Sequence, residues 1–290
     1  MNRAGLLGAA LVVLSGAGAA HGQAQVEAPD TSAVDPVDPR AARTPFGLGE
    51  HLVYRVKVGI FGVGYGHMTL DSQVDTVRGH RTYRATMGIE GRLTFASVDD
   101  EYQSWFDTRS LQTWRYIRDV HQINYKSLRH FEMYPERRRW ERADNDEFGT
   151  LGSSLPLDDV SFIYFIRTLP LEVGKTYTLN RYFKDDGNPV VIRVVRRDQR
   201  EVGAGTFNTI VVEPIIKTDG LFGEGGEAEL HFTDDERRLL VYLKSDIPNF
   251  PGSLTLHLEN IQEGLPLHPA NRDRARARHA ETAITTGQRR

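Results

Sequence analysis

Between residues 46 and 265, apolar and polar side chains alternate in a series of short runs. The first run, HLVYRVKVGI, has large apolar residues at every second position from Leu52 to Ile60. Because successive side chains of a strand point to opposite faces, this period of two predicts a β-strand with one buried face. The run TYRATMGI repeats the pattern after a turn at RGHR, so the two runs predict an antiparallel meander.

Further alternating runs continue to the end of this region. They are EYQSWFDT, LQTWRYIR, SLRHFEMY, RRRWERAD, KTYTLNRYF, VVIRVVRRDQREV, FNTIVVEPIIK, EAELHFT, LLVYLKS and GSLTLHLENIQ. Turn signals such as DDGNP, VGAG and TDDERR separate several of them. Many short strands with almost no helical periodicity predict a single, mostly β domain, whose curved antiparallel sheet forms a barrel or half-barrel.

One stretch, DDVSFIYFIRTLP, breaks the alternation. Its apolar residues would fill both faces of a strand, whereas at ~100° per residue most of those from Phe162 to Leu169 share one arc of a helix. Asp158 and Asp159 suit a helix N-terminus, and Pro170 disfavours its continuation. The pattern therefore predicts a short amphipathic helix over about 158–169 that covers the open face of the sheet and is too short to span a bilayer.

The other flank of this helix carries polar side chains. Ser161, Tyr164 and Arg167 follow Asp158 at three-residue spacing, so they climb one side of the helix. Two roles are open to them. In the first, Arg167 pairs with a carboxylate of the sheet and Tyr164 rests on the sheet; in the second, the flank binds an anionic headgroup. Half-buried polar groups usually complete hydrogen bonding, which favours the first role.

The run GIFGVGYGHM contains four glycines, at 59, 62, 64 and 66. A dinucleotide-binding loop would require Gly-x-Gly-x-x-Gly at the start of a helix, whereas these glycines continue into a strand. Glycine inside a strand permits sharp coiling, a bulge or the close approach of another backbone. The run therefore predicts a bend in the sheet.

Both ends of the chain differ from its middle. Residues 1–22 combine a positive start, an apolar run and a small-residue pattern at Ala20 to Gly22, which predicts a cleaved signal peptide. Residues 23–45 are rich in Pro, Asp and Ala, and residues 266–290 are rich in Arg. Neither segment has a core-forming pattern, so both are expected to be disordered.

The predicted signal peptide implies that the protein is exported, and the composition of the chain refines this predicted location. The chain has no cysteine, which excludes both a disulfide and the lipid-modified cysteine of a bacterial lipoprotein. We therefore predict a soluble periplasmic protein with no transmembrane span after signal cleavage. A formal net charge of -3 gives no reason to expect a nucleic-acid partner.

The chain shows no catalytic constellation. It lacks a thiol nucleophile and a Gly-x-Ser-x-Gly elbow, and its histidines are scattered without the spacing that holds zinc. The paired carboxylates at 99–100, 185–186 and 234–235 fall in predicted turns, where such pairs are usually solvated turn formers. We therefore predict no enzymatic activity, no cofactor and no metal site.

The order of several motifs resembles the bacterial exported family called domain of unknown function 3108. The residues that carry the resemblance are Gly49, Glu50, Leu52 and Tyr54; Asp158, Ser161, Tyr164 and Arg167; and Ala204, Gly205 and Phe207. The likeness spans nearly the whole of residues 46–265. It implies a cell-envelope protein with a curved antiparallel sheet, and it implies no reaction.

Two hypotheses about function follow. The first is a periplasmic, non-enzymatic binding or carrier module for a lipid or other hydrophobic ligand, held on the concave face under the helix. The side chains predicted to contact this ligand are Phe162, Tyr164, Phe165, Ile166, Arg167, Tyr54 and Tyr65. The alternative is an envelope assembly or interaction protein with a fully packed core, whose edge strands and Arg-rich tail bind a protein partner.

Overall fold

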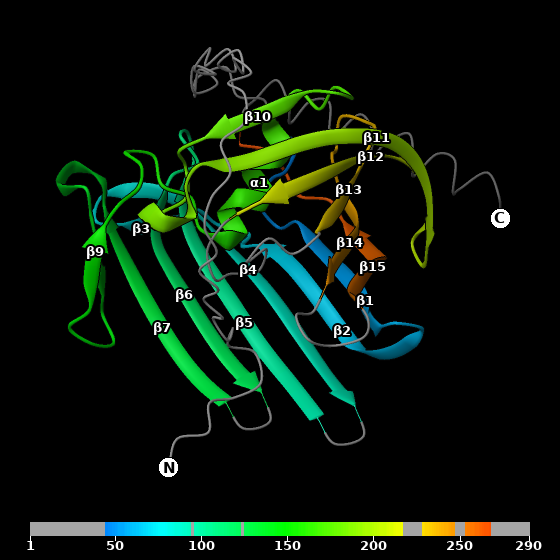
Figure 1. Ribbon diagram of the computed structural model, residues 1–290, viewed down its shortest axis with the longest axis horizontal. Coiled ribbons are helices and arrows are strands. Elements are labelled where there is room, and N and C mark those ends of the chain that lie inside the picture. The colour runs from blue at the N-terminus through cyan, green and yellow to red at the C-terminus, as the bar shows by residue number, and fades with distance from the viewer. Residues whose placement is uncertain (1–43, 94–95, 123–124, 217–227, 247–252, 268–290) are drawn as a thin grey trace, which may run out of the picture.

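A single antiparallel sheet curls around one α-helix in the computed structural model (Figure 1). The model describes residues 44–93, 96–122, 125–216, 228–246 and 253–267, so the predicted signal peptide, nearly all of the predicted linker and nearly all of the Arg-rich tail lie outside the described residues. The mostly β, curved antiparallel architecture expected from the alternating runs is confirmed.

Among the described residues, fifteen strands make up the sheet. They are β1 (His51–Val58), β2 (Phe61–Leu70), β3 (Asp75–Val77), β4 (His80–Leu93), β5 (Ala96–Asp107), β6 (Thr113–Gln122), β7 (Tyr125–Tyr134), β8 (Arg139–Arg142), β9 (Phe148–Thr150), β10 (Thr176–Leu179), β11 (Val190–Val202), β12 (Gly205–Ile215), β13 (Glu229–Thr233), β14 (Leu240–Asp246) and β15 (Ser253–Gln262). Their order is β10-β11-β12-β13-β14-β15-β1-β2-β4-β5-β6-β7-β8-β9, with β3 paired to β4.

The sheet is a half-barrel, because its two edge strands, β9 and β10, do not pair with each other. Isolated bridges join the segments that lie just beyond these edges, between Leu151 and Lys184 and between Leu157 and Tyr182. We call this unclosed join the seam.

The inner face of the sheet forms the core. In β1, Leu52, Tyr54 and Val56 are buried, as their alternation predicts. The prediction was wrong for Ile60, which is 87% exposed, because β1 ends at Val58 and the chain turns at Gly59 with a φ of 60°. Periodicity assigned the face correctly but did not show where the strand stops.

The acidic pair at 99–100 is a second correction. It was predicted in a turn, yet both residues lie within β5, which pairs with β4 on one side and β6 on the other. Asp100 is buried, and its Oδ1 accepts a hydrogen bond from the backbone N–H of His121 at 3.0 Å. Pairing on both sides of the strand overrides the local turn preference of aspartate.

Helix α1 (Asp159–Thr168) lies inside the curve of the sheet (Figure 1). Its position confirms the helix predicted at 158–169, with Asp158 as the N-cap and Leu169 as the C-cap. The expectation of one apolar and one half-buried polar flank was wrong, because every residue from Asp159 to Arg167 is buried. A helix enclosed by a sheet on several sides has no flank left for water.

The bend expected from the glycine run is confirmed in β2. The pairing of β1 with β2 shifts register between Val56 and Lys57, and Gly64 lies opposite Gly91 of β4. A Cβ atom at Gly64 would lie 1.9 Å from the carbonyl oxygen of Glu90. Only glycine allows the two backbones to approach this closely.

Replacing this glycine tests the close approach. Gly64→Ala should destabilise the fold by about 1–3 kcal/mol, because backbone atoms must move to accept the methyl group. Gly62→Ala is the matched control, since the nearest atom to its Cβ would be the Arg55 Cδ at 3.9 Å and no strain is expected. Urea unfolding of both variants measures the difference, and equal stabilities would contradict the packing described for β2 and β4.

Candidate functional site

A buried ion pair anchors α1 to the first strand. Arg167 Nη1 donates to Glu50 Oε1 at 2.6 Å and Arg167 Nη2 donates to Glu50 Oε2 at 2.8 Å, and the two side chains are 0% and 2% exposed. Arg167 Nη2 also donates to the carbonyl oxygen of Arg237 at 3.2 Å. Burial alone lowers the pKa of Arg167, but the negative charge of Glu50 outweighs it and the pKa lies above its usual range. The first of the two roles considered for this flank is therefore confirmed for Arg167.

Asp158 fixes the other end of the helix. Its Oδ1 accepts hydrogen bonds from the N–H groups of Val160 at 2.8 Å and Ser161 at 3.0 Å. Its Oδ2 accepts from the hydroxyls of Ser104 at 2.5 Å and Thr113 at 2.7 Å, which belong to β5 and β6. Burial raises the pKa of Asp158 to about 6, and these hydrogen bonds oppose the shift. One carboxyl thus caps the helix and ties it to the sheet.

The structure brings six of the seven predicted ligand contacts into the packed core. Phe162, Tyr164, Phe165, Ile166, Arg167 and Tyr54 are all buried. Tyr54 donates its hydroxyl to the carbonyl oxygen of Leu240 at 3.0 Å, and Tyr164 donates to that of Thr69 at 3.4 Å. A ligand that contacted all six would have to displace α1, so their role in ligand binding stays a prediction.

Tyr65 lies apart from the other six. It is 45% exposed on the outer face of β2, where the guanidinium of Arg55 stacks 4.2 Å from its ring centroid. In this strand Gly66 and Met68 are buried and lie on the inner face of the sheet. Because side chains alternate along a strand, Tyr65 points outward. It therefore cannot share a site with residues beneath the helix.

A small pocket opens on the inner face at the seam, next to the N-terminus of α1; we call it the seam pocket. Its lining residues come from β6, β7, α1 and the segment after β10, and they are Tyr116, Arg118, Arg129, Phe131, Asp159, Tyr182, Phe183 and Lys184. The cavity volume is about 10 Å³, which is the space of about one water molecule. Its deeper walls are buried aromatic rings, whereas the three cationic side chains are only partly buried.

Asp159 forms the floor of the seam pocket. Its Oδ2 accepts a hydrogen bond from the Tyr116 hydroxyl at 2.9 Å, and its Oδ1 accepts one from the Tyr182 hydroxyl at 3.1 Å. Burial, reinforced by the carboxylate of Asp159, raises the pKa of both tyrosines well above the usual range. Both tyrosines therefore remain neutral donors, and the Asp159 carboxylate is held in place by neutral partners.

The sequence did contain a signal for this pocket. In β6, Arg118 occupies an inner-face position between Tyr116 and Val120, and in β7 Arg129 stands two residues before Phe131 in the same phase. A charged residue in the apolar phase of a strand marks a place where the inner face meets solvent or a polar group. Lys184 carries no such signal, since it lies outside any strand.

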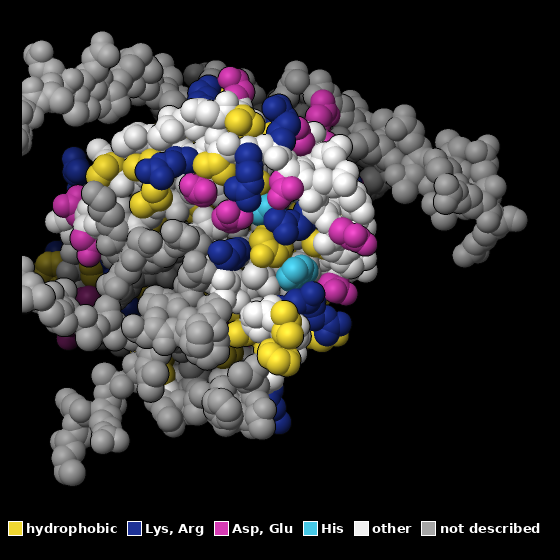
Figure 2. Space-filling model, turned by 45° about the vertical axis from the view of Figure 1, so that its right-hand side comes forward, with side chains coloured by type: hydrophobic (Ala, Val, Ile, Leu, Met, Phe, Trp, Pro, Cys, Tyr) yellow, Lys and Arg dark blue, Asp and Glu magenta, His cyan; other side chains and the backbone are white. Residues whose placement is uncertain are grey.

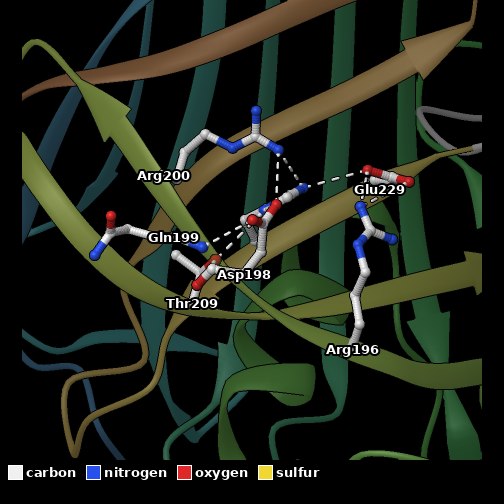
Figure 3. A network of polar contacts seen from close by, with 7 residues as sticks. Arg196, Asp198, Gln199, Arg200, Thr209 and Glu229 are labelled. Atoms are coloured by element: carbon white, nitrogen blue, oxygen red, sulfur yellow. Dashed lines mark hydrogen bonds and ion pairs between the residues drawn. The ribbon is translucent and has the colours of Figure 1, made fainter.

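A polar network covers part of the outer face of β11 to β13 (Figure 3). Arg196 Nη2 donates to Glu229 at 3.0 and 3.2 Å. His231 is fully buried, with Nε2 at 3.3 Å from both Glu229 and Arg200. Burial, reinforced by the positive charge of Arg200, lowers the pKa of His231 from 6.5 to about 4. Figure 2, which brings this side forward, shows acidic and basic side chains interspersed, so the network neutralises itself.

Metal-ligating groups do not gather in the described part of the chain: no three His, Cys, Asp or Glu side chains are placed there to hold an ion. The same residues include no helix with the length and apolar character needed to cross a bilayer. The seam pocket is lined by charged and aromatic side chains, and within the described residues we find no catalytic arrangement around it.

Residues 53–259 match the family model described as "Protein of unknown function (DUF3108)". The chain belongs to this family. In this DUF3108 chain, Glu50 of the first motif and Arg167 of the second form the buried ion pair. No curated protein matches the chain.

Several solved structures are similar to this chain at low sequence identity. A "beta-barrel-like protein of domain of unknown function DUF1849" from Brucella abortus aligns with a TM-score of 0.50 at 9% identity, covering 75% of this chain and 99% of its own. A "putative lipoprotein" from Parabacteroides distasonis aligns with a TM-score of 0.33 at 10% identity, covering 76% and 98%. A "putative exported protein" with a YmcC-like fold from Bacteroides fragilis gives 0.29 at 9%, covering 76% and 98%. The first shows a barrel-like fold, and the other two support no further conclusion.

Removing one partner of the buried ion pair should lower the stability of the fold far more than removing both partners. Arg167→Met leaves the Glu50 carboxylate buried without a partner and should cost about 3–5 kcal/mol. Combining Arg167→Met with Glu50→Met removes both charges and should recover at least half of that loss. Urea unfolding with a double-mutant cycle measures the coupling; additive losses would contradict a mutual role for the pair.

The buried His231 should make the fold sensitive to acid. Its pKa of about 4 in the folded chain lies below the ordinary 6.5, so the stability it contributes is complete above pH 6.5 and is lost as the pH falls toward 4. The free energy of unfolding should fall by on the order of 2–3 kcal/mol over this pH range. His231→Gln should therefore lose less stability than the unaltered chain between pH 7 and pH 4.5, measured by urea unfolding, and parallel profiles would refute the assignment.

Proposed function

We propose that this DUF3108 protein is a non-enzymatic binding protein of the cell envelope that takes a lipid or another hydrophobic small molecule at the seam pocket. The observation that carries the proposal is the opening on the inner face, between β7 and the segment after β10, which is lined by four aromatic and four charged side chains. Ligand sites combine apolar surface with convergent polar groups.

The position of the ligand differs from the one that the sequence suggested. The space under α1 is filled by protein, because Ile163, Tyr164 and Ile166 have no exposed surface. A cavity of about 10 Å³ at the seam admits only the tip of a ligand. The remainder would lie along the mouth, where the partly buried side chains of Arg118, Arg129 and Lys184 have room to rearrange. A periplasmic location, as predicted from the signal peptide, completes the proposal.

A second function is favoured by a different observation. Ile60 and Phe61, at the turn between β1 and β2, are 87% and 69% exposed. Hairpin turns are usually polar, so two large apolar side chains at a tip are typical of a contact surface. Together with the packed surroundings of α1, they support the alternative of an envelope interaction protein without a small-molecule ligand.

A cysteine-free chain allows a direct test. Full-length protein prepared from the cell envelope should carry a bound mass in native mass spectrometry, and organic extraction should remove it. A single cysteine introduced as Lys184→Cys and labelled with a bulky maleimide should prevent rebinding by blocking the seam pocket. Lys126→Cys, labelled in the same way on the exposed outer face of β7, is the matched control and should not.

The opposite results would separate the two functions. If repeated preparations carried no bound mass, and the labelled and unlabelled proteins bound added single-chain amphiphiles equally or not at all, the binding function would be refuted. The interaction function would then be the better explanation, and Phe61→Ser would be the variant with which to test it.

A further inference from the structure

We propose that Arg118, Arg129 and Lys184 form a binding site for an oxyanion of the phosphate class, so that the ligand of the seam pocket is an acidic amphiphile. This inference rests on the proposed function and specifies the chemistry of its ligand. The three cations come from β6, from β7 and from the segment after β10, and they converge on one pocket.

The three cations have no carboxylate partner at ion-pair distance in the described part of the chain, although Arg129 Nη2 donates to the Tyr125 hydroxyl at 3.5 Å. No carboxylate in the described part of the chain lies within 4.0 Å of Arg118, Arg129 or Lys184, the distance that defines the protein's ion pairs. A nearby cation on the outer face behaves differently, since Arg115 of β6 binds Glu132 of β7 at 2.5 Å. Positive charge that exceeds the nearby negative charge leaves an attraction for an anion.

Asp159 offsets only part of this charge, although it acts electrostatically on Arg118. It is the one acidic residue that lines the seam pocket, and both of its oxygens accept hydrogen bonds from tyrosine hydroxyls. Three cations against one carboxylate leave the pocket with a net positive charge (3 − 1 = +2). The hydroxyls of Tyr116 and Tyr182 are already used by Asp159, so the N–H groups of the cations are the donors that an incoming anion would meet.

Aromatic rings hold two of the cations near the pocket while leaving N–H groups free. The Nζ of Lys184 lies 5.7 Å from the ring centroid of Phe131 and 5.9 Å from that of Phe183. The guanidinium of Arg118 lies 5.6 Å from the ring centroid of Tyr102. Arg118 also donates a side-chain hydrogen bond to Tyr102, so its remaining N–H groups are the ones open to an anion. Arg and Lys are the side chains that bind phosphate oxygens best.

The size of the cavity agrees with a headgroup more than with a hydrocarbon chain. A space of about 10 Å³ accepts one oxygen atom of an oxyanion, whereas the rest of the group stays at the mouth among the cations. Free phosphate and a phosphate headgroup offer the same oxygens. The structure alone therefore indicates an oxyanion of the phosphate class and does not distinguish between these two sources. The apolar part of the ligand comes from the proposed function.

Isothermal titration of the full-length protein with three probes separates these sources. Dodecyl phosphate, below its micelle concentration, should bind the unaltered chain and the control Lys126→Gln equally. It should bind Arg118→Gln and Lys184→Gln at least ~tenfold more weakly, the effect of one lost charge-assisted contact. Dodecyl maltoside, with the same chain and a neutral head, should bind weakly and be insensitive to these substitutions. Inorganic phosphate should displace dodecyl phosphate.

Each contrary outcome has a distinct meaning. Undiminished binding of dodecyl phosphate to Arg118→Gln and Lys184→Gln would overturn the oxyanion site and leave the proposed function standing. Binding of inorganic phosphate alone, lost in both variants, would keep the site and overturn the hydrophobic ligand. Binding of none of the probes would overturn both. Arg118→Lys, which keeps the charge, should retain most of the affinity, and thermal unfolding verifies that each variant is folded.

Discussion

The fold depends on a pair of opposite charges placed where water cannot reach them. Glu50, just before β1, and Arg167, in the last turn of α1, are 117 residues apart in the chain and meet through two hydrogen bonds in the core. Each charge is tolerable there only because the other is present, so the pair requires the helix and the first strand to adopt one relative position. A purely apolar contact would permit many orientations, whereas two aligned hydrogen bonds between planar groups permit few.

The position of the helix also decides where the protein opens. With Arg167 held at one end and Asp158 bonded to β5 and β6 at the other, the first turn of α1 is directed toward the seam. Asp159 then meets Tyr116 and Tyr182 at the floor of the seam pocket. The same helix thus fills the space inside the half-barrel, and its first turn lies beside the small seam pocket.

Much of the fold could be predicted because alternation is a local property. Leu52 and Tyr54 are buried since every second residue of a strand faces the same way, and the stretch around Phe162 is helical since no strand could bury it on one face. The failures were also physical. Ile60 is exposed because a turn ends the strand, and Arg167 is fully buried because the sheet surrounds the helix, which no helical wheel can reveal.

The sequence by itself determined the class of fold, the helix and its cap, and the family, because each depends on side chains close together in the chain or on motifs in a fixed order. Only the tertiary structure decided that Glu50 is the partner of Arg167 and that Arg118, Arg129 and Lys184 share a pocket. Those contacts follow from the curvature of the sheet and from its two edges approaching without pairing. The curvature of the sheet and the approach of its edges both result from the twist and pairing of many strands together, and no single stretch of the chain encodes them.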